Sequence, residues 1–150
     1  MCPNPCSGLG EVGRRLFGKT MVLKTELILD TWSLIEYFLG TPAGAKVRKI
    51  LEGQSSDPAI SSISVAELYK WSLRTGSVEE ANENLLFVLD RCEVVPVDTT
   101  IAREAGKISA ERGCGLADAL IYATARLTGR QIMTGDPHFK NGKDVVYIGD

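Results

Sequence analysis

Four acidic residues stand where a predicted strand has just ended or a predicted helix is just beginning. They are Asp30 in LDTWS, Glu67 in SVAELY, Asp118 in LADALIYATA and Asp136 in TGDPHF. Carboxylates crowded together repel one another and take up protons unless a cation holds them. Mg²⁺ and Mn²⁺ accept hard oxygen ligands and pair well with phosphate, whereas zinc favours thiol and imidazole ligands. If the four acids meet, the sequence therefore predicts a Mg²⁺ or Mn²⁺ site.

Each acid also has a purely structural explanation. Asp30 could cap the helix that follows it, and Asp136 could cap a turn. Glu67 completes a capping box with Ser64 in the order S-x-x-E. Asp118 falls in the first turn of its helix, where the helix dipole favours a negative charge. The residue types alone do not separate a cap from a site.

Asp118 stands out because its helix is otherwise apolar. Plotted at 100° per residue, residues 116–127 leave almost no polar face, so this helix should be buried nearly all round. A buried carboxylate is costly unless it is hydrogen-bonded, paired or bound to a metal. Asp118 is therefore either a cap or part of a site.

The elements that must position these acids alternate along the chain. Short segments rich in β-branched residues predict strands at 25–29, 59–63, 93–97, 131–134 and 145–148. Capping residues and glycines predict helices at 33–39, 43–51, 65–73, 78–91, 101–112 and 116–128. Strands separated by helices imply a parallel sheet covered on both faces. We predict an α/β fold, a three-layer α/β/α sandwich, for a single domain over residues 21–150.

Lateral position in the sheet discriminates between the acids. With the strand order 3-2-1-4-5, Asp30 and Asp136 follow adjacent central strands, roughly 5 Å apart. Glu67 follows the second strand, and Asp98 follows the third, at the margin. We therefore expect Asp98 to be a cap and the other acids to cluster. Two helices lie between strands three and four, so the sequence does not force Asp118 to the same edge.

The remaining features limit the class of protein. The chain has 150 residues, a net charge of −2 and no apolar run long enough for a membrane span. The four cysteines are scattered, and we interpret them as reduced thiols of a cytoplasmic protein. Residues 1–20 are rich in glycine and proline and predict a flexible tail, with Met21 as the suspected native start.

In their order along the chain, the motifs LDTWSLIEYF, ISVAELYKW, GLADALIYATA and TGDPHF resemble those of the PIN-domain ribonucleases, in particular the VapC-type toxins of prokaryotic toxin–antitoxin pairs. The resemblance covers about residues 25–148. It implies a five-stranded parallel sheet of order 3-2-1-4-5 and metal-dependent cleavage of RNA. It also implies that Asp30, Glu67 and Asp118 form the acidic core and that Asp136 is a fourth ligand, direct or through water.

Other residues have supporting roles in this hypothesis. The hydroxyls of Thr31, Ser33 and Thr134 are spaced to hydrogen-bond the carboxylates or metal-bound waters, unless they are simply solvated loop hydroxyls. The sole histidine, His138, is a weaker candidate for a general base than for a surface or packing residue. The cations that we expect to contact RNA phosphates are Lys70, Lys140 and Lys143.

A protein partner is also expected. The first and third helices carry more large apolar side chains than one buried face needs, which predicts a binding groove. By resemblance, that groove would hold an antitoxin segment or a second protomer, and a homodimer is expected. Two alternatives stay open: a housekeeping PIN nuclease in RNA processing, and a non-catalytic phosphate- or metal-binding signalling domain.

Overall fold

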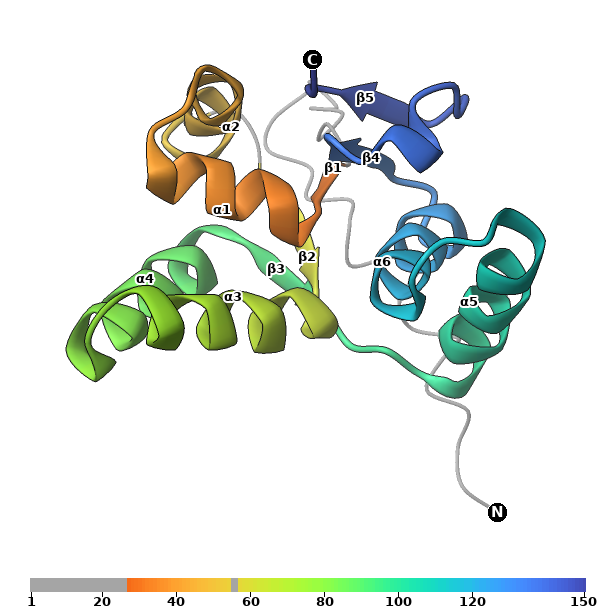
Figure 1. The fold of residues 1–150 in the computed structure, drawn as a ribbon, viewed down its shortest axis with the longest axis horizontal. Helices are drawn as coiled ribbons and strands as arrows, with labels where there is room; N and C mark the ends of the chain where they lie inside the picture. The colour runs from red at the N-terminus through yellow and green to blue at the C-terminus, as the bar shows by residue number, and fades with distance from the viewer. Residues whose placement is uncertain (1–26, 55–56) are drawn as a thin grey trace, which may run out of the picture.

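A five-stranded, all-parallel sheet of order β3-β2-β1-β4-β5 forms the centre of the computed structural model, which describes residues 27–54 and 57–150 (Figure 1). The strands are β1 Leu27–Leu29, β2 Ala59–Ser61, β3 Glu93–Val95, β4 Gln131–Thr134 and β5 Val145–Tyr147. The predicted fold class and strand order are confirmed. The predicted tail at residues 1–20 lies outside the described residues.

Helices cover both faces of the sheet. They are α1 Thr31–Leu39, α2 Pro42–Leu51, α3 Ser62–Thr75, α4 Val78–Arg91, α5 Thr99–Arg112 and α6 Leu116–Leu127, and a short 3₁₀ helix, η2, spans Pro137–Phe139. Figure 1 shows α1 to α4 on one side of the strands and α5 with α6 on the other. This is the predicted three-layer arrangement.

The two cores arise from the alternation of side chains along each strand. In β1, Ile28 packs against the α5 and α6 side, whereas Leu27 and Leu29 pack against the other side. In β4, Ile132 and Met133 divide in the same way. Successive residues of a strand point to opposite faces, so a sheet covered on both sides needs apolar residues at every position.

The helix starts depend on caps that the sequence analysis placed only in part. α4 begins as predicted, with Ser77 and Glu80 forming a capping box. α3 begins three residues earlier than predicted, because β2 ends at Ser61 and the Ser61 hydroxyl accepts a hydrogen bond from the Ile63 amide at 3.2 Å. Ser64 is therefore inside the helix, and the predicted capping box of Ser64 with Glu67 is wrong.

The described residues include two of the four cysteines. Cys92 and Cys114 are buried free thiols, whereas Cys2 and Cys6 lie outside the described residues. Within the part of the chain that the structure describes, none of the helices has the length and apolar character needed to cross a membrane.

Candidate active site

Asp30 occupies the centre of the carboxyl edge of the sheet. It directly follows β1, and its backbone amide donates to the Met133 carbonyl oxygen of β4 at 3.2 Å. Its carboxylate caps α1 by accepting from the Ser33 amide at 2.7 Å. Only 6% of Asp30 is exposed. Asp30 is thus both a helix cap and a buried carboxylate on the central strand pair.

The electrostatic environment of Asp30 is unfavourable for a charge. Burial raises the pKa of Asp30 to about 6, against the opposing effect of hydrogen bonds with Thr134 and Ser33. The Asp118 carboxylate raises the pKa of Asp30 further. A neighbouring negative charge opposes ionisation, so this effect places Asp118 within electrostatic range of Asp30.

Glu67 is tied to the start of α1 by a side-chain hydrogen bond. The Thr31 hydroxyl donates to Glu67 Oε2 at 2.5 Å, and the Thr31 and Ser64 hydroxyl oxygens lie 3.2 Å apart. Thr31 and Ser64 are buried, whereas Glu67 is half-buried. The contact holds the Glu67 carboxylate beside the residue that follows Asp30. Glu67 therefore belongs to the edge that Asp30 occupies, as the strand order predicted.

Asp118 does not act as a hydrogen-bonding cap. The N-cap of α6 is Gly115, which has no side-chain cap, and none of residues 27–54 and 57–150 shares a hydrogen bond with the Asp118 carboxylate. Asp118 is exposed, and the expectation that this helix is buried nearly all round is wrong, because Leu116 and Leu127 are exposed as well. Partial desolvation still raises the pKa of Asp118, the carboxylates of Asp136 and Glu67 raise it further, and His138 lowers it. α6 therefore begins at the same edge, which the sequence left open.

Asp136 is fixed by the turn that follows β4. Its amide donates to the Thr134 hydroxyl at 3.0 Å, and its Oδ1 accepts from the His138 amide at 2.9 Å. His138 Nδ1 lies 2.8 Å from the same Oδ1. Gly135 lets the turn pass beneath Trp32, because a Cβ there would lie 2.3 Å from the indole ring. The turn thus places Asp136 beside the α1 segment that follows Asp30.

The predicted hydroxyls all have structural partners at this edge. Thr31 contacts Glu67, and Thr134 contacts both Asp30 and the Asp136 amide. The Ser33 hydroxyl donates to the Met133 carbonyl oxygen at 2.9 Å and so joins α1 to β4. These contacts orient the acid-bearing segments. They are not solvated loop hydroxyls, because Thr31, Ser33 and Thr134 are buried.

The donor chemistry fits a divalent ion, but a complete ligand geometry is not present. Hard oxygen ligands are offered by Asp30, Glu67, Asp118 and Asp136. Asp118 raises the pKa of Asp30, and its own pKa is raised by Glu67 and Asp136. In the described part of the chain, no group of three or more His, Cys, Asp or Glu side chains is arranged closely enough to hold a metal ion. The acids therefore share one electrostatic site without forming a preassembled coordination shell.

Asp98 is separate from this cluster. Its carboxylate accepts from the Ile101 amide at 2.8 Å and caps α5. Asp98 is not among the residues that shift the pKa values of Asp30 and Asp118. The expectation that Asp98 is a cap at the sheet margin agrees with this geometry.

The three predicted lysines are exposed. Lys70 lies three residues after Glu67 on α3, and Lys140 and Lys143 follow η2. The Lys140 ammonium lies 5.1 Å from the Tyr147 ring centroid. Within the described ranges, these lysines form no ion pair with the four acids.

Arg112, at the end of α5, is a candidate that the sequence motifs did not indicate. Burial raises the pKa of the Cys114 thiol most, the Asp118 and Asp136 carboxylates raise it further, and Arg112 lowers it. Arg112 and both acids thus act on the same thiol, which lies between Arg112 and Asp118 in the sequence. A basic residue in the last turn of a helix is common because it interacts favourably with the helix dipole, so Arg112 did not stand out in the sequence. The segment RGCGLAD, a glycine turn between Arg112 and Asp118, was the available signal.

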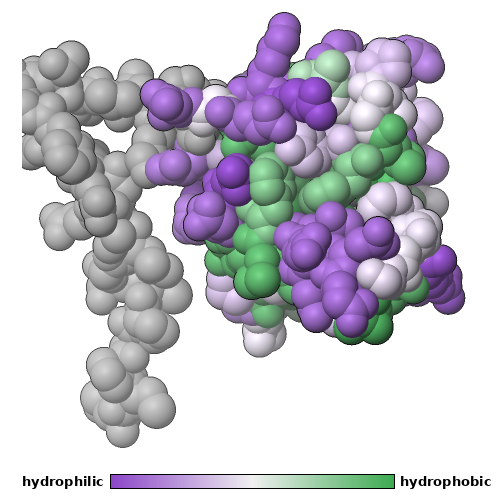
Figure 2. All heavy atoms as spheres, turned by 90° about the vertical axis from the view of Figure 1, so that its left-hand side faces the viewer, coloured by the Kyte–Doolittle hydropathy of each residue, from purple (hydrophilic) through white to green (hydrophobic). Residues whose placement is uncertain are grey.

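A second surface, the aromatic groove, lies between α1, α2 and α4. It encloses about 380 Å³ and is lined by Tyr37, Phe38, Arg48, Glu83, Asn84 and Phe87. Figure 2 looks onto this side of the molecule and shows apolar surface between hydrophilic areas. The Tyr37 and Phe87 rings stack with centroids 5.4 Å apart. The sequence predicted a groove on the first and third helices. The groove in the structure includes α1, but its other lining residues come from α2 and α4, not from α3.

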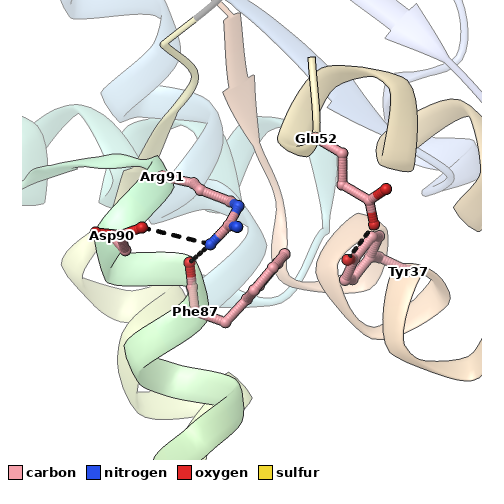
Figure 3. Close-up of polar contacts among 5 residues, drawn as sticks. All are labelled: Tyr37, Glu52, Phe87, Asp90 and Arg91. Atoms are coloured by element: carbon pink, nitrogen blue, oxygen red, sulfur yellow. Dashed lines mark hydrogen bonds and ion pairs between the residues drawn. The ribbon is translucent and has the colours of Figure 1, made fainter. Parts of the chain in front are cut away.

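Charged groups surround the aromatic groove. The Tyr37 hydroxyl donates to Glu52 at 2.7 Å, and the Arg91 guanidinium lies 3.9 Å over the Phe87 ring (Figure 3). Arg91 also donates to the Phe87 carbonyl oxygen at 3.3 Å. An apolar floor with a charged rim is the usual composition of a protein-binding surface.

Solved structures share this fold. A comparison with curated proteins returned no significant match. A toxin–antitoxin complex from Klebsiella pneumoniae is 23% identical, with a TM-score of 0.68, over 83% of this chain and 99% of that one. DNA-bound VapBC from Salmonella typhimurium is 22% identical, with a TM-score of 0.66, over 82% and 98%. Mycobacterium tuberculosis VapC20, a Sarcin-Ricin loop cleaving toxin, is 17% identical, with a TM-score of 0.61, over 74% and 92%.

The family assignment rests on the sequence itself. The family model of the PIN domain matches residues 27–144, which extend from β1 to the residue before β5 and contain all four acids of the cluster. Since the match spans well over half of the chain, this protein belongs to the PIN domain family.

Proposed function

We propose that the protein is a divalent-metal-dependent endoribonuclease. The observation that carries the proposal is the electrostatic coupling of Asp118 with Asp30, Glu67 and Asp136 at one edge of a PIN fold. Carboxylates that raise one another's pKa favour a bound cation, which would relieve their repulsion. The description of the structurally similar VapC20 as a toxin that cleaves the Sarcin-Ricin loop supports RNA as the substrate.

The residues have distinct parts in the proposed reaction. Asp30, Glu67, Asp118 and Asp136 would hold Mg²⁺ or Mn²⁺. When bound, such an ion lowers the pKa of water and stabilises the leaving oxygen during phosphodiester hydrolysis. Thr31 orients Glu67, and Thr134 orients Asp30, through the contacts described above. The side chains proposed to attract the RNA backbone to this edge are Lys70, Lys140 and Lys143.

Metal removal tests this proposal. The purified protein is expected to cleave structured RNA with Mg²⁺ or Mn²⁺, to lose cleavage in EDTA and to regain it when excess metal is added. Product ends and rates are measured by gel electrophoresis of labelled RNA. Cleavage that persists in EDTA, or the absence of cleavage with both metals, would contradict a metal-dependent ribonuclease.

We also propose that the protein is the cytoplasmic toxin of a toxin–antitoxin pair and that its antitoxin binds the aromatic groove. The similar structures from K. pneumoniae and S. typhimurium are toxin–antitoxin or VapBC assemblies, which supports such a partner. The groove offers the stacked rings of Tyr37 and Phe87 as apolar contacts and Arg48 and Glu83 as polar ones. A homodimer remains part of the proposal, and the same experiment measures it.

The partner is tested with the product of the neighbouring gene. Mixing is expected to shift the elution volume and suppress RNA cleavage, and Phe87→Ala is expected to weaken the complex at least about tenfold, as for a central aromatic contact. Leu86→Ala is the matched control, because Leu86 precedes Phe87 on α4, is 66% exposed and does not line the groove. Light scattering of the free protein gives its oligomeric state. If the active enzyme neither binds the product of the neighbouring gene nor is inhibited by it, the result would favour the alternative of a housekeeping PIN nuclease.

A further inference from the structure

Arg112 rests on a pair of stacked aromatic rings. The Tyr122 and Phe139 ring centroids lie 4.6 Å apart with an interplanar angle of 12°. The Arg112 guanidinium carbon lies 4.9 Å from the Tyr122 centroid and 5.7 Å from the Phe139 centroid. α5 ends at Arg112 because Gly113 adopts a left-handed conformation, with φ +67°. The guanidinium therefore has a defined position at the end of the helix.

The two rings connect Arg112 to the segments that carry the acids. Tyr122 lies four residues after Asp118 on α6, about one helical turn along the same face. Phe139 lies three residues after Asp136 and closes the short helix η2 that Asp136 caps. Arg112 is therefore linked to the acid-bearing segments through Tyr122 and Phe139. It is close to the cluster without neutralising it.

The hydrogen-bonding groups of Arg112 are available for a ligand. Arg112 is exposed, and in the described residues it forms no ion pair. By contrast, Arg126 pairs with Glu104 and Arg130 pairs with Glu93. The guanidinium lies beside both rings, and within the described residues its N–H groups are in no hydrogen bond, so they can pair with the oxygens of a phosphate. Stacking also restricts the side chain and lowers the entropy lost on binding.

We propose that Arg112 binds a backbone phosphate of the RNA adjacent to the phosphate that is cleaved at the acidic cluster. This inference rests on the proposed ribonuclease function and adds a substrate-binding residue to it. Arg112 contacts Tyr122, which lies one helical turn beyond Asp118 on α6, so Arg112 and Asp118 address different phosphates of one strand. The alternative is that Arg112 merely covers the rings of Tyr122 and Phe139.

Two substitutions separate phosphate binding from ring covering. Arg112→Met keeps an apolar side chain over the rings but removes the charge, and Arg112→Lys keeps the charge. Arg103→Met is the matched control. Arg103 is exposed on the same helix, roughly 13 Å along the axis from Arg112 and on the opposite face. All three substitutions are compared with the unsubstituted chain, and circular dichroism checks that each variant folds.

Binding and cleavage are measured on the same proteins. Binding of a labelled single-stranded RNA is followed over a salt series in an Asp118→Asn background, and cleavage kinetics use chains with Asp118 intact. Arg112→Met is expected to weaken binding roughly tenfold, as for one charge-assisted contact. It should raise KM more than it lowers kcat, and it should reduce the slope of log K against log salt by about 0.7. Arg112→Lys should retain most of the binding, and Arg103→Met should match the parent.

The possible results distinguish phosphate binding by Arg112 from the proposed ribonuclease function. If the parent cleaves and binds RNA but Arg112→Met behaves like Arg103→Met, the inference is wrong and the nuclease stands. If Arg112→Lys binds RNA as weakly as Arg112→Met and both lower the thermal midpoint equally, the arginine only covers the rings. If the parent neither binds nor cleaves RNA, both the proposed function and the inference fail.

Discussion

Asp118→Asn is expected to abolish RNA cleavage while the fold is retained. The Asp118 carboxylate makes no cap hydrogen bond, so the substitution removes a charge without removing a structural contact. It also relieves the repulsion from Asp136 and Glu67, which raises the pKa of Asp118 in addition to burial. We expect kcat/KM to fall by more than about 100-fold, the upper range for losing an outer-shell partner of a metal.

The matched control for this prediction is Asp98→Asn. Asp98 follows β3, caps α5 and lies outside the cluster, and asparagine is an equally good cap. Both variants remove one negative charge from a helix start, and asparagine can keep the cap of α5, so neither variant is expected to lose a structural contact. Cleavage rates, Mn²⁺ binding and thermal midpoints are compared. Equal cleavage by all three proteins would indicate a contaminating nuclease or a different site, and loss of cleavage in both variants would contradict the assignment of Asp98 as a cap.

The sequence predicted the fold well because its local signals agree with one another. β4 was predicted at its observed bounds, and α4 begins where its capping box requires. These features depend on short-range caps, which can be read from a sequence. The strand order, which places Asp30 and Asp136 after adjacent strands, was implied by the resemblance to PIN domains.

What the sequence could not predict depends on contacts across the fold. The segment ISSIS is compatible with a strand or a helix start, and only the end of pairing between β2 and β3 at Ser61 decides between them. Whether Asp118 reaches the acidic edge depends on how α5 and α6 pack, because two helices separate it from β3. The stacking of Arg112 on Tyr122 and Phe139 joins three segments that no periodicity connects.

Asp30→Asn is expected to stabilise the metal-free protein at neutral pH while abolishing RNA cleavage. Burial raises the pKa of Asp30 from 3.8 to about 6. The folded state therefore binds the proton more tightly than the unfolded state does. The contribution of Asp30 to the free energy of unfolding is therefore greatest below pH 4, falls as the pH rises from 4 to 6, and stays lower above that range. A difference of about two pKa units corresponds to about 3 kcal/mol.

Asparagine keeps the cap at this position, since its side-chain oxygen can accept from the Ser33 amide as the carboxylate does. The free energy of unfolding in EDTA, measured by urea titration from pH 4 to 8, should therefore fall with pH in the unsubstituted protein and fall less in Asp30→Asn. The two proteins should have similar stabilities at pH 4 and differ by up to about 3 kcal/mol at pH 8. Asp98→Asn should show the same pH dependence of stability as the unsubstituted protein, because Asp98 is exposed.

Mn²⁺ should raise the thermal midpoint of the unsubstituted protein at pH 8 and leave that of Asp30→Asn nearly unchanged. A destabilised Asp30→Asn at pH 8 would show that the charge of Asp30 serves the fold, and the assignment of this buried carboxylate to a cation site would then be wrong.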